Sequence, residues 1–258
     1  MKVAVCAKVV PAGRQNRRID PSSGRIVRDA GALSDLDRHA VEEALRIRER
    51  GEADEVLVVS MAPGASLGAV RDALAMGADR AIQVSDPALE GSDLLGTSRV
   101  LAHVLRQESP DLVIFGPQGE DSNGAMLWSA AASRLGLPVL SQVEELALED
   151  GRARIVRQTE AGYETLDAPL PCVIGVTGSI NQPRFAPVKG KIAAHKKPLA
   201  LASLAQLGLP PDLAGRAGAG TTVTALREPP RRAEGQVVRG PDVEVEVYEF
   251  LRSKRLVP

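Results

Sequence analysis

The sequence predicts an α/β fold: a mostly parallel, doubly wound sheet with a β-meander and an extended C-terminal arm. Over the first two thirds of the chain, short apolar runs alternate with amphipathic helical segments. Continuous apolar strands of this kind are typical of a parallel sheet covered by helices on both faces. From about residue 139 the pattern changes to alternating strands separated by tight turns. We expect one α/β domain over residues 1–198 and an arm or tail over residues 199–258.

The composition excludes several functional classes. The chain has 258 residues, with 32 Lys and Arg against 33 Asp and Glu, which argues against nucleic acid or an anionic membrane as the main partner. Its two cysteines, Cys6 and Cys172, are too few for a disulfide framework or a zinc site, which favours a reducing, cytoplasmic location. No apolar run approaches the roughly 20 residues that span a bilayer, so we do not expect an integral membrane protein.

The first unit of the pattern is a buried strand over residues 3–7, followed by a polar stretch over residues 14–28. Within that stretch, the turn at residues 20–24 predicts a hairpin. A helix then starts after Ser34, whose side chain suits an N-cap, with Asp35 and Asp37 in the first turn.

The same pattern continues along the chain. Further strands are expected over residues 56–60, 80–84 and 112–115, and further helices over residues 67–76, 93–107 and 122–135. The meander is expected over residues 143–149, 152–159 and 164–167, and another buried strand over residues 172–176. Gly and Ala over residues 214–222 indicate a linker, and residues 243–255 form a last short helix or strand.

No catalytic signature occurs in the sequence. It contains no Gly-x-x-x-x-Gly-Lys-Ser/Thr loop, no Gly-x-Ser-x-Gly elbow and no His-Glu-x-x-His pair. The three histidines are scattered, so we expect no metal site. The adjacent Glu120 and Asp121 could form a general-base pair, but acids at a helix start more often interact with the helix dipole. We therefore expect no catalytic residue.

The expected position of each segment in the fold indicates a ligand site more clearly than any sequence motif does. In an open parallel sheet, ligands bind outside the carboxyl ends of the strands, at the point where the strand order reverses. Four segments are expected to meet there: residues 6–8, 34–37, 60–64 and 116–124. The last is a glycine-containing loop that enters a helix, which suits an anion.

These segments resemble the beta subunit of electron-transfer flavoprotein. The similarity covers residues 1 to about 198. It is most specific at residues 40–46, 71–80, 112–118, 181–185 and 195–198.

The resemblance implies an adenine-nucleotide hydrolase-like, Rossmann-like sheet and a heterodimer with an alpha subunit, on which residues 199–258 would pack. The alpha subunit holds most of the FAD site. In most members the beta subunit holds AMP, and in the electron-bifurcating branch it holds a second FAD. Such a protein would carry electrons from dehydrogenases, of acyl-CoA or a similar type, to a quinone reductase or another acceptor. It would take part in fatty acid oxidation as an electron carrier, without a catalytic site of its own.

By position, the resemblance places the contacts to AMP or a second nucleotide in the segments already singled out. These residues are Cys6, Ser34, Asp35, Leu36, Asp37, Met61, Gly116, Pro117, Gln118, Gly119, Glu120, Asp121, Ser122, Asn123, Gly124, Ala125, Met126 and Leu127.

The expected nucleotide site departs from the family pattern. Leu36 stands where the family commonly has Phe, and Met126, Leu127 and Trp128 replace a Gln-Thr-Gly or Gln-Val-Gly stretch. Two phosphate-facing donors are therefore missing, and a buried phosphate without donors costs several kcal/mol. The AMP site is thus either altered, adapted to another ligand, or empty.

The segment that resembles the family's partner docking loop also departs from the pattern. Its candidate residues are Arg184, Phe185, Val188, Lys189 and Lys191. Val188 stands at a position that is usually Leu, and a smaller side chain buries less apolar area. The two lysines make the segment more basic. This predicts either a different redox partner or a solvated arm on the alpha subunit.

Three alternatives stay open at this point. One is a structural paralogue that keeps the heterodimer interface but has lost the AMP site, with side chains filling the cleft. Another is an electron-bifurcating member with a second FAD. The third is a stand-alone ATP-binding enzyme, against which stands the absence of a phosphate loop and of a catalytic acid.

Overall fold

The computed structural model describes residues 1–13, 18–28, 31–227, 230, 235 and 237–258. The first residues of the polar stretch expected over residues 14–28 lie outside this set. The chain divides into two compact units, Met1–Thr224 and Ala225–Pro258.

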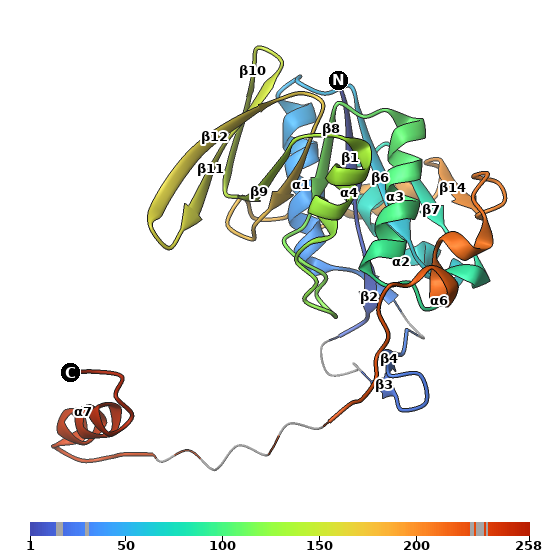
Figure 1. Cartoon of the computed structure of the whole chain (residues 1–258). Coiled ribbons are helices and arrows are strands. Elements are labelled where there is room, and N and C mark those ends of the chain that lie inside the picture. The colour runs from blue at the N-terminus through green and yellow to red at the C-terminus, as the bar shows by residue number, and fades with distance from the viewer. Residues whose placement is uncertain (14–17, 29–30, 228–229, 231–234, 236) are drawn as a thin grey trace. The chain divides into compact units, whose positions relative to one another are not determined.

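The first unit is built on a seven-stranded sheet in which every pairing is parallel (Figure 1). In order across the sheet, the strands are β14 (Leu199–Ala202), β7 (Arg80–Val84), β6 (Glu55–Met61), β1 (Lys2–Cys6), β8 (Leu112–Phe115), β13 (Cys172–Val176) and β9 (Val139–Val143). The central strand β1 pairs with β6 on one side and β8 on the other. The strand order therefore reverses at β1, which is where an open sheet of this kind binds ligands.

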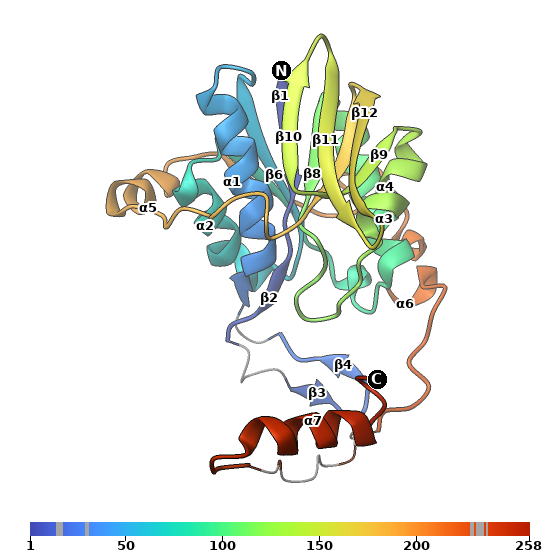
Figure 2. The ribbon, with the colours of Figure 1, turned by 90° about the vertical axis from the view of Figure 1, so that its left-hand side faces the viewer.

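Helices cover both faces of the sheet, which confirms the predicted doubly wound α/β fold (Figures 1 and 2). The helices of this unit are α1 (Asp35–Glu49), α2 (Leu67–Met76), α3 (Leu94–Glu108), α4 (Leu127–Leu135), α5 (Val188–Ala194) and the short α6 (Gly215–Gly218). Short 3₁₀ turns lie at η2 (Gly64–Ser66), η3 (Pro87–Leu89) and η4 (Pro211–Leu213).

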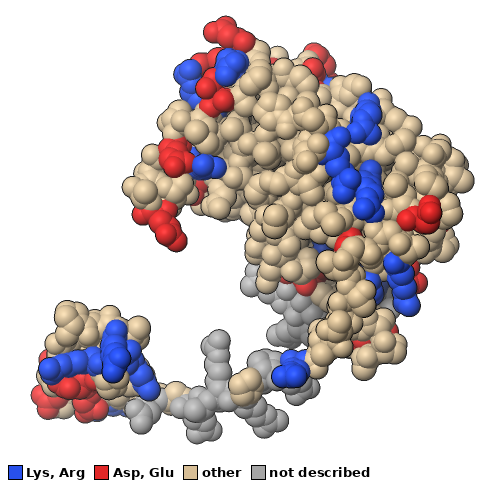
Figure 3. Space-filling view, viewed as in Figure 1, with Lys and Arg blue, Asp and Glu red and all other residues tan. Residues whose placement is uncertain are grey.

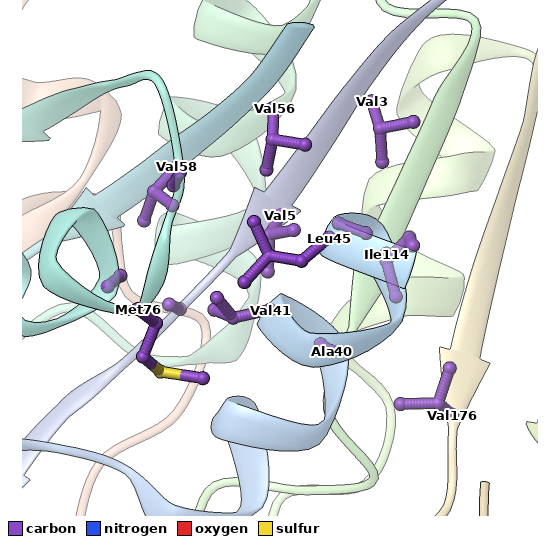
Figure 4. Packing of buried hydrophobic residues seen from close by; sticks show 14 of the residues in the cluster. Val3, Val5, Ala40, Val41, Leu45, Val56, Val58, Met76, Ile114 and Val176 are labelled. Atoms are coloured by element: carbon purple, nitrogen blue, oxygen red, sulfur yellow. The ribbon is translucent and has the colours of Figure 1, made fainter. Parts of the chain in front are cut away.

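Alternation along β1 divides the core into two layers. Val3 and Val5 face α1 and α2, whereas Ala4 and Cys6 face α3 and α4. Figure 4 shows the first layer, where Val41 and Leu45 of α1 lie against the valines of β1. A core of small aliphatic side chains brings the helices close to the sheet, consistent with the low aromatic content of 2%.

The meander is a separate three-stranded antiparallel sheet beside the central one. It consists of β10 (Glu145–Glu149), β11 (Arg152–Thr159) and β12 (Gly162–Pro169). The alternating pattern over residues 143–149 placed Val143 in the meander. In the structure, Val143 ends β9, which pairs with β13 at the edge of the central sheet. The sequence pattern merged two strands here because only Glu144 separates them.

Two small antiparallel pairs lie near the carboxyl end of β1. One joins β2 (Val9–Pro11) to β5 (Gly31–Leu33). The other is the predicted hairpin, with β3 (Ile19–Asp20) and β4 (Arg25–Ile26). The hairpin is confirmed in place and type.

Two sequence predictions about helices were wrong. Helix α4 begins at Leu127 rather than at residue 122, because the preceding residues form a tight turn in which Asn123 donates to the Gly119 carbonyl at 2.7 Å. Asn123 has a positive φ of 51°, which a right-handed helix does not accommodate. The segment treated as a docking loop contains the helix α5, which starts at Val188.

The chain after residue 198 stays with the first unit for longer than expected. Residues 199–202 form an edge strand of the central sheet, and the unit continues to Thr224. The Gly/Ala-rich segment is packed rather than a linker: Ala214 is fully buried, and Arg99 donates to the carbonyls of Leu213 and Gly218 at 3.1 and 2.7 Å.

In the second unit, residues Val243–Ser253 form the helix α7, which decides between the helix and the strand that the sequence left open. Its apolar side chains, including Val245 and Phe250, are about half exposed within the chain. Among the described residues, no helix is long and apolar enough to cross a membrane.

Candidate functional site

A cleft of about 770 Å³ opens at the carboxyl ends of β1, β6 and β8. Its position is the one expected from the reversal of strand order at β1, and its volume falls within the range of small-molecule sites. The apolar part of its wall comes from Val59, Met61, Leu101 and Phe115, among others. The cleft can therefore take a flat apolar ring system together with a polar group.

Half of the predicted nucleotide contacts line this cleft. Those that do are Cys6, Asp37, Met61, Gly116, Gln118, Gly119, Ser122, Gly124 and Leu127. Those outside its lining are Ser34, Asp35, Leu36, Pro117, Glu120, Asp121, Asn123, Ala125 and Met126. Met126 is 64% exposed and points away from the interior. Positional transfer from a family thus leads to loops that border the cleft, and half of the residues it names lie in the lining; their contact with a nucleotide stays a prediction.

Asp37 joins the two loops that follow β1 and β8. Its carboxylate accepts the backbone N–H of Lys8 at 2.7 Å and also that of Gly116. Burial raises the pKa of Asp37 to about 7, even though these donors and the charge of Lys8 oppose the rise. A Cβ atom on Gly116 would lie 2.2 Å from the Asp37 carboxylate, so the approach of the two loops requires glycine.

A cluster of three charged residues lies beside the cleft. The Asp121 side chain is fully buried and accepts from Lys8 Nζ at 2.5 Å and from Arg28 Nη2 at 2.6 Å. Burial would raise the pKa of Asp121, but the bonds and charges of Lys8 and Arg28 hold it below its usual value. The carboxylate is thus ionised and paired with cations from two other segments, rather than acting at the start of a helix.

The opposite side of the cleft is formed by η3 and the start of α3. Asp93 caps α3 by accepting from Gly96 N at 2.8 Å, and it also accepts from Gly220 N at 2.8 Å. Asp86 accepts from Ala88 N at 3.0 Å and Leu204 N at 3.1 Å. The carboxylates of Asp86 and Asp93 thus accept hydrogen bonds from backbone N–H groups on this same side of the cleft.

Trp128 packs without filling the cleft. Its indole ring lies against Gly175 of β13, where an added Cβ would be 3.1 Å from the ring. The ring occupies the space that this glycine leaves while also lining the cleft. The side-chain-filled cleft expected for a structural paralogue is therefore not what the structure contains.

Several residues that line the cleft are absent from the nucleotide contacts predicted from the sequence. Lys8 follows β1 directly, so the rule that ligands bind beyond the strand ends identifies it. Arg25 and Arg28 come from the hairpin, and no local pattern indicates that this hairpin reaches the cleft. The residues of η3 and early α3 were missed because the helix-start signal at Asp93 marks a cap and not a ligand.

The predicted docking residues divide into two groups. Arg184 is bound to Glu42 at 2.8 and 3.0 Å and to Glu49 at 2.9 Å, so it fixes the segment onto α1. In contrast, Phe185 is 96% exposed and Val188 74% exposed, and Lys189 and Lys191 are exposed beside them.

The parallel sheet and the open cleft at its switch point define an α/β protein of the nucleotide-binding type. The family described as electron transfer flavoprotein domain matches residues 24–207. The chain belongs to the electron transfer flavoprotein family, as the sequence resemblance predicted.

Relatives in three bacteria match almost the full length of the chain. The caffeyl-CoA reductase-Etf complex subunit CarD of Acetobacterium woodii is 35% identical over 257 residues, covering 98% of this chain and 97% of the relative. The electron transfer flavoprotein subunit beta of Mycobacterium bovis is 37% identical over 243 residues, covering 92% and 91%. That of Megasphaera elsdenii is 29% identical over 272 residues and covers both chains fully.

Proposed function

We propose that the chain is the beta subunit of a heterodimeric electron-transfer flavoprotein, a carrier without catalytic chemistry of its own. The observation that carries this proposal is the similarity to subunits of that kind over nearly the whole chain. The family and the fold agree with it, since a cleft at the switch point is suited to a nucleotide group.

An alpha subunit is the expected partner, and the surface of the first unit supports this. Figure 3 shows few charged side chains between the meander and the Lys and Arg side chains over α3 and α4. Met126, Val139 and Tyr163 expose apolar surface in this region of the fold, at 64%, 38% and 71%. Depletion of charge together with exposed large apolar residues is typical of the core of a stable interface. The half-exposed apolar side chains of α7 support a contact of the tail with the same partner.

FAD shared with the alpha subunit is the proposed redox cofactor, and AMP is the proposed ligand of the cleft. The apolar lining suits an adenine ring, and Lys8 and Arg28 supply positive charge for a phosphate. A second FAD in place of AMP is the alternative that the cleft volume of about 770 Å³ favours. When bound, the flavin supplies the electron transfer, and this chain would orient it and exclude water.

The donor is proposed to be a dehydrogenase of the acyl-CoA or a similar type, and the acceptor a quinone reductase or a similar protein, in the cytoplasm. Phe185 and Val188 are exposed apolar residues followed by Lys189 and Lys191, which suits a partner surface with an apolar pocket and acidic rim. Replacing Val188→Asp should slow reduction of the flavin by such a dehydrogenase, whereas Val188→Leu should preserve or increase the rate. Equal rates for both variants would contradict docking at this segment.

The first test is the nucleotide content of the complex. The chain is co-expressed with an alpha subunit of the family, and the purified complex is denatured and analysed by chromatography for FAD and AMP. One FAD and one AMP per heterodimer would support the proposal as stated. Two FAD and no AMP would support the alternative occupant. The absence of both a complex and FAD would contradict the proposed function.

A further inference from the structure

The two sides of the cleft carry charges of opposite sign. The side formed by β1, the hairpin and the loop after β8 contributes three cations, Lys8, Arg25 and Arg28, against one acid, Asp37, whose carboxylate accepts backbone N–H groups of the two loops. The side formed by η3 and α3 contributes Asp86, Glu90 and Asp93. A ligand with an anionic end and an uncharged ring therefore has one favoured orientation.

The acids of one side are already bound to local donors. Both oxygens of Asp86 and both oxygens of Asp93 accept backbone N–H groups, and Glu90 pairs with Arg216 at 3.1 Å. These carboxylates stabilise the wall of the cleft and leave little capacity to bind a ligand cation.

The cations of the other side are only partly neutralised. Lys8 and Arg28 together carry two positive charges, and Asp121 carries one negative charge between them. The Lys8 and Arg28 side chains line the cleft and remain 33% and 34% exposed, whereas the Asp121 side chain is fully buried. Among the described residues, the three groups therefore carry a net positive charge at the cleft, and Asp37 beside Lys8 has its carboxylate bound to backbone N–H groups.

The start of α4 is the other place where a phosphate could bind, and its side chains do not suit one. No side chain caps the helix at Met126, and Leu127 and Trp128 are apolar. In the loop before it, the N–H groups of Ser122 and Asn123 are bound to the Gly119 carbonyl at 3.1 and 2.7 Å. The helix dipole and the backbone N–H groups of the first turn remain, but the side-chain donors that would accompany them at a phosphate site are absent from Met126 and Leu127.

We propose that Lys8 and Arg28, rather than the start of α4, bind the phosphate of the nucleotide in the cleft, with Asp121 as the internal counter-ion that competes with it. The inference rests on the proposed function, because it takes a nucleotide to be the ligand of the cleft. On this proposal, Lys8 and Arg28 set the preference of the cleft for a nucleotide over the corresponding nucleoside. The planar guanidinium of Arg28 suits bidentate contact with phosphate oxygens, and Lys8 adds a point charge.

The test measures AMP and adenosine binding to the heterodimer by calorimetry, after bound nucleotide has been removed by gel filtration at high salt. Replacing Arg28→Gln or Lys8→Gln should weaken AMP binding by about tenfold or more, because each removes a charge-assisted hydrogen bond. Adenosine binding should change by less than about twofold, because adenosine has no phosphate. Where the purified complex contains FAD in the cleft, FAD and riboflavin replace AMP and adenosine.

The Asp121→Asn variant tests whether Asp121 competes with the phosphate for Lys8 and Arg28 or only stabilises the fold. This variant removes the negative charge beside the phosphate and keeps the side-chain size, so AMP binding should become several times tighter. A structural role alone would weaken AMP and adenosine equally. Arg157→Gln is the matched control: it removes a cation that pairs with Glu164 on the meander, outside the cleft lining, and it should leave both affinities unchanged.

Two results would overturn the inference while leaving the proposed function intact. One is a heterodimer with FAD that binds AMP equally well with and without the Arg28 and Lys8 charges. The other is an intact FAD-containing heterodimer whose cleft binds neither nucleotide. Failure of the proposed function would look different, since no FAD-containing complex would form with any variant.

Discussion

Two ion clusters in the first unit use similar residues for different purposes. On α1, Arg184 lies between Glu42 and Glu49, and Arg46 also pairs with Glu42 at 3.3 Å. The charges there balance, and the cluster fixes the segment after β13 onto the helix. Beside the cleft, Lys8 and Arg28 share the single acid Asp121, and both cations reach the cleft.

The difference shows that charge balance and access to a cavity separate a structural cluster from a binding one. Both clusters contain a buried carboxylate, with Glu42 at 4% side-chain exposure and Asp121 at 0%. Burial therefore does not distinguish them. The net positive charge of the second cluster, and its position on the cleft wall, are the reasons for proposing it as a site for an anion.

Removing Arg184 should have the largest effect on stability. Arg184→Leu removes the guanidinium bonds and leaves the buried Glu42 with Arg46 and the backbone N–H of residue 184 as partners, and we expect a loss of about 3 kcal/mol in the free energy of unfolding at pH 7. Burial would raise the pKa of Glu42, but its bonds to Arg184 and Arg46 and the charge of Arg184 hold that pKa below its usual value of 4.5. The loss should therefore be present at neutral pH and shrink as the pH falls below about 4. Urea denaturation at several pH values measures it, and a loss that does not depend on pH would contradict the assigned role.

Asp37 is a third buried acid, and its hydrogen bonds come mainly from backbone N–H groups rather than from cationic side chains. Because burial raises its pKa from 3.8 to about 7, the folded state binds more protons than the unfolded state between these values. This group alone should therefore lower stability by about 1.4 kcal/mol for each pH unit as the pH rises through that window. In Asp37→Asn this dependence should disappear. Denaturation of the two proteins at pH 5 and pH 7 tests the prediction, and parallel slopes would refute it.

Arg28→Gln should change stability little while changing nucleotide affinity strongly. Arg28 makes one bond to Asp121, Gln can still donate to that carboxylate and Lys8 still pairs with it, whereas Arg184→Leu removes bonds to two acids, so we expect about 1 kcal/mol or less in the free energy of unfolding. Arg184→Leu should give the reverse pattern, with lower stability and unchanged AMP affinity per folded complex. Measuring both quantities for both variants tests whether the two clusters are functionally separate, and the same pattern in both variants would remove the distinction.

The exposed pairs of the meander should give the smallest effect. Arg157 on β11 pairs with Glu164 on β12 at 2.8 Å, and both side chains remain partly exposed. Arg157→Gln should alter the free energy of unfolding by about 0.5 kcal/mol or less, as is usual for surface ion pairs. Thermal denaturation measures this, and a loss as large as that of Arg184→Leu would show that burial and charge balance do not rank these pairs.

The sequence was most informative where local pattern and burial agree. The strand predicted over residues 80–84 and the helix over residues 67–76 match β7 and α2 at both ends. In both, the apolar residues face a core and the ends are marked by turns or glycine. The start of α4 was misplaced because acidic and small polar residues resemble a helix start, whereas the Gly119 carbonyl holds them in a turn.

The candidate site was predicted at the level of loops and not of side chains. The rule for ligand binding in parallel sheets depends on strand ends alone, and it led to Cys6, Met61 and Gly116, which line the cleft. Arg28 and Asp121 are 93 residues apart, and their ion pair depends on how the hairpin lies against the loop. No short-range pattern contains that information.

The chain has a single tryptophan, and its indole ring lines the cleft. Its fluorescence therefore arises from one known position, against Gly175, rather than from an average over many sites. An adenine ring or a flavin entering the cleft would alter the emission of this ring directly, and a flavin would also accept its excitation energy. The protein thus carries an intrinsic optical reporter of its own occupancy, and no label needs to be introduced.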